Sequence, residues 1–161
     1  MLRTHASRCH MRAVAAFLAL LAWSSQGGAV DSPMAGTWEV ERKCSNTGYL
    51  KCIPESFSVR LFIKDGRLCG THSSVAQGGN KVDELGGKEP TLTGQVSGKT
   101  ATVAFRSSFE GKGKAAIALS RTHLRWHILE QDGEAWLPPD ATLHRVRNTA
   151  WGSQLSCEWS K

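Results

Sequence analysis

Apolar and polar residues alternate one by one through most of the chain between Gly36 and Val146. The stretch FSVRLFIK shows this most clearly, because every second position from Phe57 to Ile63 is apolar. A two-residue period predicts β-strands with one buried face and argues against helices. The same reading predicts eight strands, at Gly36–Lys43, Phe57–Lys64, Arg67–Ser73, Thr91–Ser97, Thr100–Ser107, Lys114–Ser120, His123–Glu130 and Asp140–Val146. The pattern therefore indicates an all-β protein.

Most connections between these strands are short, which predicts antiparallel pairing of strands that follow one another. Asp65-Gly66 is a strong signal for a two-residue hairpin turn, in which both central residues need positive φ. Eight strands in up-and-down order can close into a barrel, and closure leaves no sheet edge exposed. Such a barrel is just wide enough to be filled by side chains or to hold one small ligand. A β-sandwich is the alternative fold.

The N-terminus has a different pattern, typical of an export signal. Three arginines precede an apolar run from Ala13 to Trp23, and the small residues Gly27-Gly28-Ala29 then form a cleavage site. The run is shorter than the roughly 20 apolar residues of a membrane-spanning helix. We therefore predict a signal peptide over residues 1–29 and a single secreted or periplasmic domain over 30–161, with no membrane span after cleavage.

The charge and the motifs exclude several classes of function. The net charge of +6 falls to +3 when Arg3, Arg8 and Arg12 leave with the signal peptide, which is too little to predict nucleic-acid binding. No G-x-S-x-G, H-E-x-x-H or phosphate-binding loop is present. His123, His127 and His144 fall on the predicted outer face, where histidines are more often surface residues than metal ligands. We expect no enzyme activity, no catalytic residues, no metal and no cofactor.

Four cysteines follow the predicted cleavage site, and an even number in an exported chain predicts two disulfides. The turn at Asp65-Gly66 sets Phe62 opposite Cys69 on the outer face of the barrel. This apolar pair needs cover, which the tail after the last strand can supply with Trp151, Leu155, Cys157 and Trp159. We therefore prefer a Cys69–Cys157 disulfide that fastens the tail to the outside of the barrel. Cys44 and Cys52 are then paired by elimination.

Several segments resemble, in the same order, the avidin and streptavidin family and, more broadly, the lipocalin-like or calycin-type barrels. They are GTW in the first strand, DGRLCGTHS, TLTGQV followed by ATVAF, LRWHIL and ATLHRVRN. The resemblance spans Gly36 to Arg147 and implies an eight-stranded barrel. In such barrels the first-strand tryptophan closes one end, and a basic residue of the last strand lies across it. The resemblance thus implies that Trp38 stacks with Arg145 or Arg147.

The resemblance also implies a ligand site inside the barrel. His72 and Ser74 occupy positions where avidin-like proteins place a tyrosine and a serine that bind the ligand, and Trp126 occupies that of a late-strand tryptophan. Trp126 and Phe105 would then supply aromatic walls, and His72 and Ser74 polar contacts.

Three departures from the family pattern concern the ligand itself. Val40 stands where the family has an asparagine, Arg147 stands where it has an acidic residue, and Phe105 and Lys114 lie near the places of two further tryptophans. The resemblance therefore implies the architecture rather than biotin as the ligand. We expect a small molecule of unknown identity as the ligand.

The longest predicted loop is SVAQGGNKVDELGGKEP, from Ser74 to Pro90. Loops of this length in a barrel of short turns are often functional, so it is either a lid over an open end or a solvated insertion.

Two functions remain. The first is an exported barrel that binds a small hydrophobic or cyclic ligand under this loop. The alternative is a secreted or periplasmic inhibitor or immunity-type protein that blocks an enzyme partner through its loops. Trp136, in QDGEAWLPPD, would be an aromatic anchor for that partner, or else a plug at the barrel end.

Overall fold

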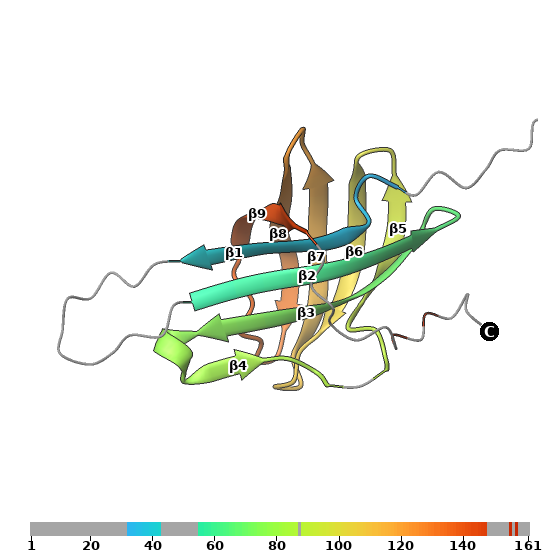
Figure 1. Ribbon diagram of the computed structural model, residues 1–161. Coiled ribbons are helices and arrows are strands. Elements are labelled where there is room, and N and C mark those ends of the chain that lie inside the picture. The colour runs from blue at the N-terminus through green and yellow to red at the C-terminus, as the bar shows by residue number, and fades with distance from the viewer. Residues whose placement is uncertain (1–31, 43–54, 87, 148–154, 156, 158–161) are drawn as a thin grey trace, which may run out of the picture.

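Antiparallel hydrogen bonding joins eight strands into a closed ring in the computed structural model, which describes residues 32–42, 55–86, 88–147, 155 and 157. The ring runs in chain order and closes by pairing its last strand with its first (Figure 1). This confirms the predicted barrel and excludes the sandwich. The strands are β1 (Gly36–Arg42), β2 (Glu55–Lys64), β3 (Arg67–Ala76), β5 (Leu92–Ser97), β6 (Thr100–Arg106), β7 (Lys112–Leu119), β8 (His123–Asp132) and β9 (Asp140–Val146).

The β2–β3 hairpin has the predicted turn and register. Asp65 and Gly66 have φ values of 51° and 73°, as a two-residue turn with two left-handed residues requires. The register places Lys64 opposite Arg67 and Phe62 opposite Cys69. Because the turn fixes the register, it also fixes which face of each strand is buried.

Side chains alternate between the barrel interior and the solvent along the strands. In β6, Ala101, Val103 and Phe105 are buried, whereas the residues between them are exposed. In Figure 1, β1, β2 and β3 cross in front of the strands that run from β5 to β8, so the barrel consists of two crossed layers with the core between them. The fully buried core side chains include Trp126, Phe105, Leu61, Leu68, Leu92, Ile117, Leu124 and Leu143.

One end of the barrel is sealed by Trp38, and we call it the Trp38 end. The Trp38 ring is 2% exposed, and its indole N–H donates to the carbonyl oxygen of Met34 at 2.9 Å. The guanidinium carbon of Arg145 lies 4.5 Å from the centre of the Trp38 ring. Arg145 also donates to the carbonyl oxygens of Ala35, at 3.0 Å, and Pro33. Of the two candidates, Arg145 and not Arg147 therefore stacks on Trp38.

The first part of the predicted loop, from Ser74 to Asp83, consists largely of regular structure. Strand β3 continues to Ala76, a 3-10 turn spans Gln77–Gly79, and β4 (Lys81–Asp83) pairs back on β3 outside the ring. Gly78 and Gly79 have φ values of 64° and 94°, which a tight reversal needs and which glycine adopts without a steric penalty. The solvated-insertion alternative is wrong for Asp83, whose side chain is fully buried.

The tail is attached to the barrel wall as predicted. Cys69 and Cys157 are joined by a disulfide, and both are buried. A disulfide is typical of proteins from oxidising compartments outside the cytosol. The predicted signal peptide and the pairing of Cys44 with Cys52 lie outside the described residues, as do Trp151 and Trp159. Within the described part of the chain, no helix is long and apolar enough to cross a membrane.

Candidate functional site

A cavity of about 390 Å³ lies at the barrel end opposite Trp38, which we call the cavity end. Strand β1 pairs with β9 only through Thr37 to Glu39, and beyond this point it pairs with β2 alone. The cavity therefore opens beside Val40, where β1 and β9 separate. It is lined by Val40, Glu55, Ser56, Phe57, Ser74, Val75, Ala76, Ile128, Gln131, Ala135, Trp136, Leu137, Pro138 and Pro139.

The cavity walls are mostly apolar, with few polar groups. Phe57, Ile128 and Leu137 contribute large apolar side chains. Ser74 donates its hydroxyl proton to the carbonyl oxygen of Trp136 at 2.7 Å, so its oxygen remains able to accept. The Glu55 carboxylate accepts the backbone N–H of Gln77 at 3.0 Å. A few placed polar groups on an apolar wall are characteristic of small-molecule sites, and the volume lies within their usual range of about 300–1,000 Å³.

Three buried aromatic rings form a cluster in the core, and one of them reaches the cavity. The Trp126 ring centre lies 5.2 Å from that of Phe57, edge-on, and 6.2 Å from that of Phe105. The Trp126 indole N–H donates to the carbonyl oxygen of Pro138 at 3.0 Å. This hydrogen bond connects the core cluster to Pro138 in the β8–β9 loop, which lines the cavity. The core therefore helps to fix the position of this cavity wall.

His72 is held in one orientation within the barrel wall. The Thr91 hydroxyl oxygen accepts the backbone N–H of His72 at 3.0 Å, and it lies 2.8 Å from His72 Nδ1. Thr91 is thus free to donate its own proton to Nδ1. In the neutral imidazole the ring proton is then on Nε2, which faces Asp83 Oδ1 at 3.5 Å. Both His72 and Thr91 are 2% exposed.

Asp83 on β4 accepts hydrogen bonds from two different loops. Its Oδ1 accepts the backbone N–H and the hydroxyl of Ser108, at 2.8 and 2.9 Å. Its Oδ2 accepts the Ser107 hydroxyl at 2.6 Å and the Trp136 backbone N–H at 2.9 Å. Burial by itself would raise the pKa of this carboxyl, but the nearby His72 imidazole, followed by the donors of Ser107, Ser108 and Trp136, holds the pKa well below its usual range.

We call these residues, Thr91, His72, Asp83, Ser107 and Ser108, the Asp83 clamp. The order hydroxyl, imidazole, carboxylate is that of a nucleophilic triad. However, Thr91, His72 and Asp83 are all buried, and the serine hydroxyls bond to Asp83 rather than to the imidazole. The arrangement therefore fits a structural role, in which β4 and the 74–90 segment are fastened to the β6–β7 and β8–β9 loops.

The fold brings Trp126 and Phe105 together in the core cluster, but of the four predicted ligand residues only Ser74 lines the cavity. Ser74 lines the cavity, whereas His72 belongs to the clamp and Phe105 is part of the buried core. Trp126 also borders a second hollow of about 740 Å³, which is lined mainly by residues of β7, β8 and β9. Ligand contact by these residues stays a prediction. Sequence reasoning did not find Glu55, Ile128 or Leu137, and the only signal near them was the rigid Pro138-Pro139 pair.

The histidines of the outer wall make two close side-chain contacts, one with another histidine and one with an aspartate. The ring centres of His123 and His144 lie 4.5 Å apart, and His127 Nδ1 lies 2.7 Å from an Asp140 carboxylate oxygen. In the part of the chain that the structure describes, no three histidine, cysteine or acidic side chains come together in a way that could hold a metal ion.

Comparison of the chain with protein-family models, with curated proteins and with solved structures found no match in any of the three. The architecture is therefore stated from the structure itself. It is a closed eight-stranded antiparallel barrel of calycin-like form, with one additional strand bonded outside the ring.

Proposed function

We propose that this protein is an exported binding protein that holds a small, mainly apolar ligand in the cavity beside Val40. The cavity itself carries the proposal, because it lies at the barrel end opposite Trp38 and one of its walls is held by the hydrogen bond from Trp126 to Pro138. The ligand would place an apolar or cyclic body against Phe57, Ile128 and Leu137. A donor group on the ligand would face Glu55 or Ser74.

The resemblance to avidin-like and lipocalin-like barrels supports the same function, since ligands of such barrels enter at one open end. The segment from Ser74 to Asp83 supports it too. Its residues Ser74, Val75 and Ala76 form part of the cavity wall, and Asp83 keeps this wall in place. Export is supported by the Cys69–Cys157 disulfide together with the predicted signal peptide.

The alternative, an inhibitor that uses Trp136 as an anchor, has less support. Trp136 is half-buried, and its indole N–H donates to Glu134 at 2.7 Å. Its ring is packed edge-on against Phe109. A side chain engaged in this way is already occupied within its own chain, whereas an anchor residue needs to be free to enter a partner's pocket.

A neutral solvatochromic dye such as Nile red, followed by displacement with a panel of apolar and cyclic compounds that includes biotin, tests the proposal. Ala76→Phe should fill the cavity and weaken dye binding by at least about tenfold, because the new ring takes the place of the ligand. Ala104→Phe is the matched control, since Ala104 is exposed on β6 and does not line the cavity.

Equal dye affinity in Ala76→Phe and the wild-type protein would place binding elsewhere. If no compound changes the emission or the melting temperature, and the immobilised protein captures an exported enzyme instead, the inhibitor alternative replaces this proposal.

A further inference from the structure

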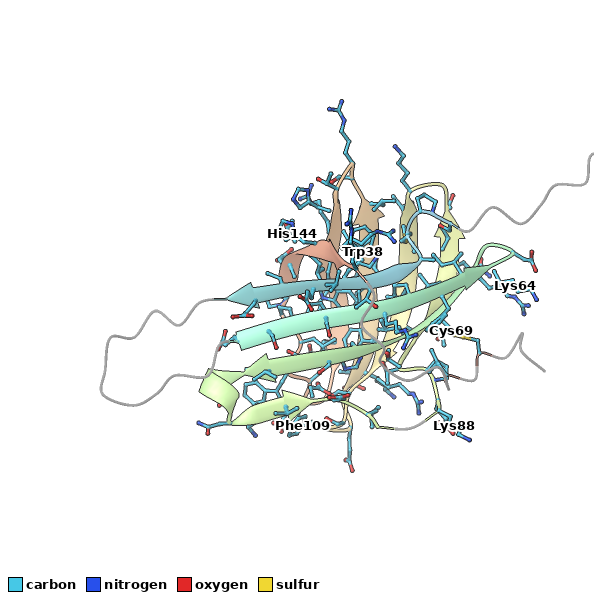
Figure 2. The ribbon with its side chains drawn as sticks, in the orientation of Figure 1. Trp38, Lys64, Cys69, Lys88, Phe109 and His144 are labelled. Atoms are coloured by element: carbon cyan, nitrogen blue, oxygen red, sulfur yellow. A yellow bond between two sulfur atoms is a disulfide. The ribbon has the colours of Figure 1, made fainter. Side chains whose placement is uncertain are left out.

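The ammonium group of Lys81 lies between two aromatic rings and a carboxylate at the cavity end. Lys81 Nζ is 5.1 Å from the centre of the Phe109 ring and 4.9 Å from that of the Trp136 ring. Glu134 Oε1 is 3.4 Å from the same nitrogen. The two rings are inclined at 75° to each other, so they form two walls of a cage. Figure 2 shows Phe109 beside β4, the strand that carries Lys81.

The walls of this cage are positioned without Lys81. The Trp136 indole N–H is fixed by Glu134, and the Trp136 backbone N–H is fixed by Asp83. The Phe109 backbone N–H donates to the Ser107 hydroxyl oxygen at 3.0 Å. An isolated parallel β-bridge between the backbones of Glu110 and Glu134 joins the two loops that bear the rings.

The loops approach closely at Gly111, where a Cβ atom would collide with the carbonyl oxygen of Glu134. Glycine at this position therefore permits the contact that sets one aromatic wall against the other. The cage is a preformed feature of two joined loops, and Lys81 enters it from a third segment.

The cage is open to solvent. The Lys81 side chain is 34% exposed and the Glu134 side chain is 54% exposed. Lys81 can therefore leave by rotating its own flexible side chain, with no change to the backbone.

We propose that the cage formed by Phe109, Trp136 and Glu134 is a binding site for the ammonium group of a ligand, and that Lys81 occupies it as a tethered competitor. The negative faces of aromatic rings attract cations, and cages of this kind recognise primary and quaternary ammonium groups. The carboxylate adds charge complementarity. This site adjoins the apolar cavity, with which it shares Trp136, and takes a different chemical group.

A tethered group competes at an effective concentration in the millimolar range or above. An external ammonium ion should therefore bind the wild-type protein weakly and bind more tightly once Lys81 is removed. Lys81→Thr removes the competitor and keeps a residue that favours a strand. Lys99→Thr is the matched control, because Lys99 is exposed in the β5–β6 turn at the Trp38 end.

The experiment titrates tetramethylammonium and, separately, n-butylammonium at constant ionic strength. The signal is the indole N–H resonance of Trp136, assigned by its loss in Trp136→Phe, and the remaining indole resonances report whether each variant is folded. We expect saturable shifts with half-saturation at least about tenfold lower in Lys81→Thr than in the wild-type protein or Lys99→Thr. Phe109→Leu and Glu134→Gln, each combined with Lys81→Thr, should weaken this binding.

Comparison of the two ions shows which kind of ammonium group the cage prefers. Tighter binding of tetramethylammonium indicates a choline-like quaternary group, and tighter binding of n-butylammonium indicates a lysine-like primary amine. If neither ion gives a saturable shift in folded Lys81→Thr, or if half-saturation is the same with and without Lys81, the proposal is overturned.

Discussion

The Asp83 carboxylate accepts the backbone N–H of Trp136 across 53 residues of sequence, at 2.9 Å. This bond joins a strand outside the barrel to the loop that walls the cavity. The segment from Ser74 to Pro90 is therefore part of the site's framework, and its contribution to stability can be measured.

Asp83→Asn should lower the free energy of unfolding at neutral pH by about 2–4 kcal/mol, because an amide cannot accept all the donors that converge on the carboxylate and brings two donors of its own. Denaturant melts at pH 7 measure this. Glu84→Gln, an exposed neighbour, is the control and should change stability by less than about 0.5 kcal/mol. A loss for Asp83→Asn as small as that of the control would contradict a clamp.

The same carboxylate should make the free energy of unfolding depend on pH in the acid range. Its pKa is lowered in the folded protein, so its contribution is complete above the ordinary value of 3.8 that applies to the unfolded chain. As the pH falls below this value, the unfolded chain takes up the proton first, and the contribution is lost progressively. The stability difference between the wild-type protein and Asp83→Asn should therefore shrink between pH 5 and pH 2. A difference that stays constant over this range would show that Asp83 has an ordinary pKa.

Trp38→Ala should destabilise the barrel by about 3–5 kcal/mol, because it empties the sealed end and leaves Arg145 without its stacking partner. Trp38→Phe keeps an aromatic ring and should cost less. Equilibrium unfolding of both variants provides the comparison, and a loss below about 1 kcal/mol for Trp38→Ala would mean that this end is not sealed by the tryptophan.

All four cysteines that follow the predicted cleavage site should be oxidised in the mature protein. Thiol titration of the denatured, unreduced protein should find less than one free thiol per chain, and a peptide map should join Cys69 to Cys157. Cys157→Ser should lower the unfolding free energy by up to about 4 kcal/mol, because the disulfide spans 88 residues. Two or more free thiols, or Cys157 joined to Cys44 or Cys52, would refute this assignment.

The regular part of the fold could be predicted because it has strong local signals. The alternation from Phe57 to Ile63 marks a strand with one buried face, and Asp65-Gly66 fixes a turn whose register then places Cys69 on the outer wall. From that position, the tail and its cysteine follow. The steps up to the position of Cys69 need only neighbouring residues and the two-residue period, whereas the pairing with Cys157 also depends on the distant apolar tail.

The Asp83 clamp could not be predicted in this way. Asp83 lies in a polar, glycine-rich stretch with no period, and its partners Ser107 and Trp136 are distant in sequence. Burial of a carboxylate is favourable only when several hydrogen-bond donors surround it. No local sequence pattern predicts that donors from distant segments converge on one side chain. The cavity was missed in part for a similar reason, because its walls depend on where β1 and β9 separate.

The pairing of β1 with β9 determines when the barrel can close during synthesis of the chain. Thr37, Trp38 and Glu39 pair with residues of β9 that are made more than a hundred positions later, so the ring stays open until β9 has been synthesised. Until then the incomplete sheet has two unpaired edges, which are templates for pairing with other chains. Contacts of this sequence separation form slowly. An incomplete ring of this kind therefore exposes unpaired edges for longer during folding than a sheet that is built from local contacts alone.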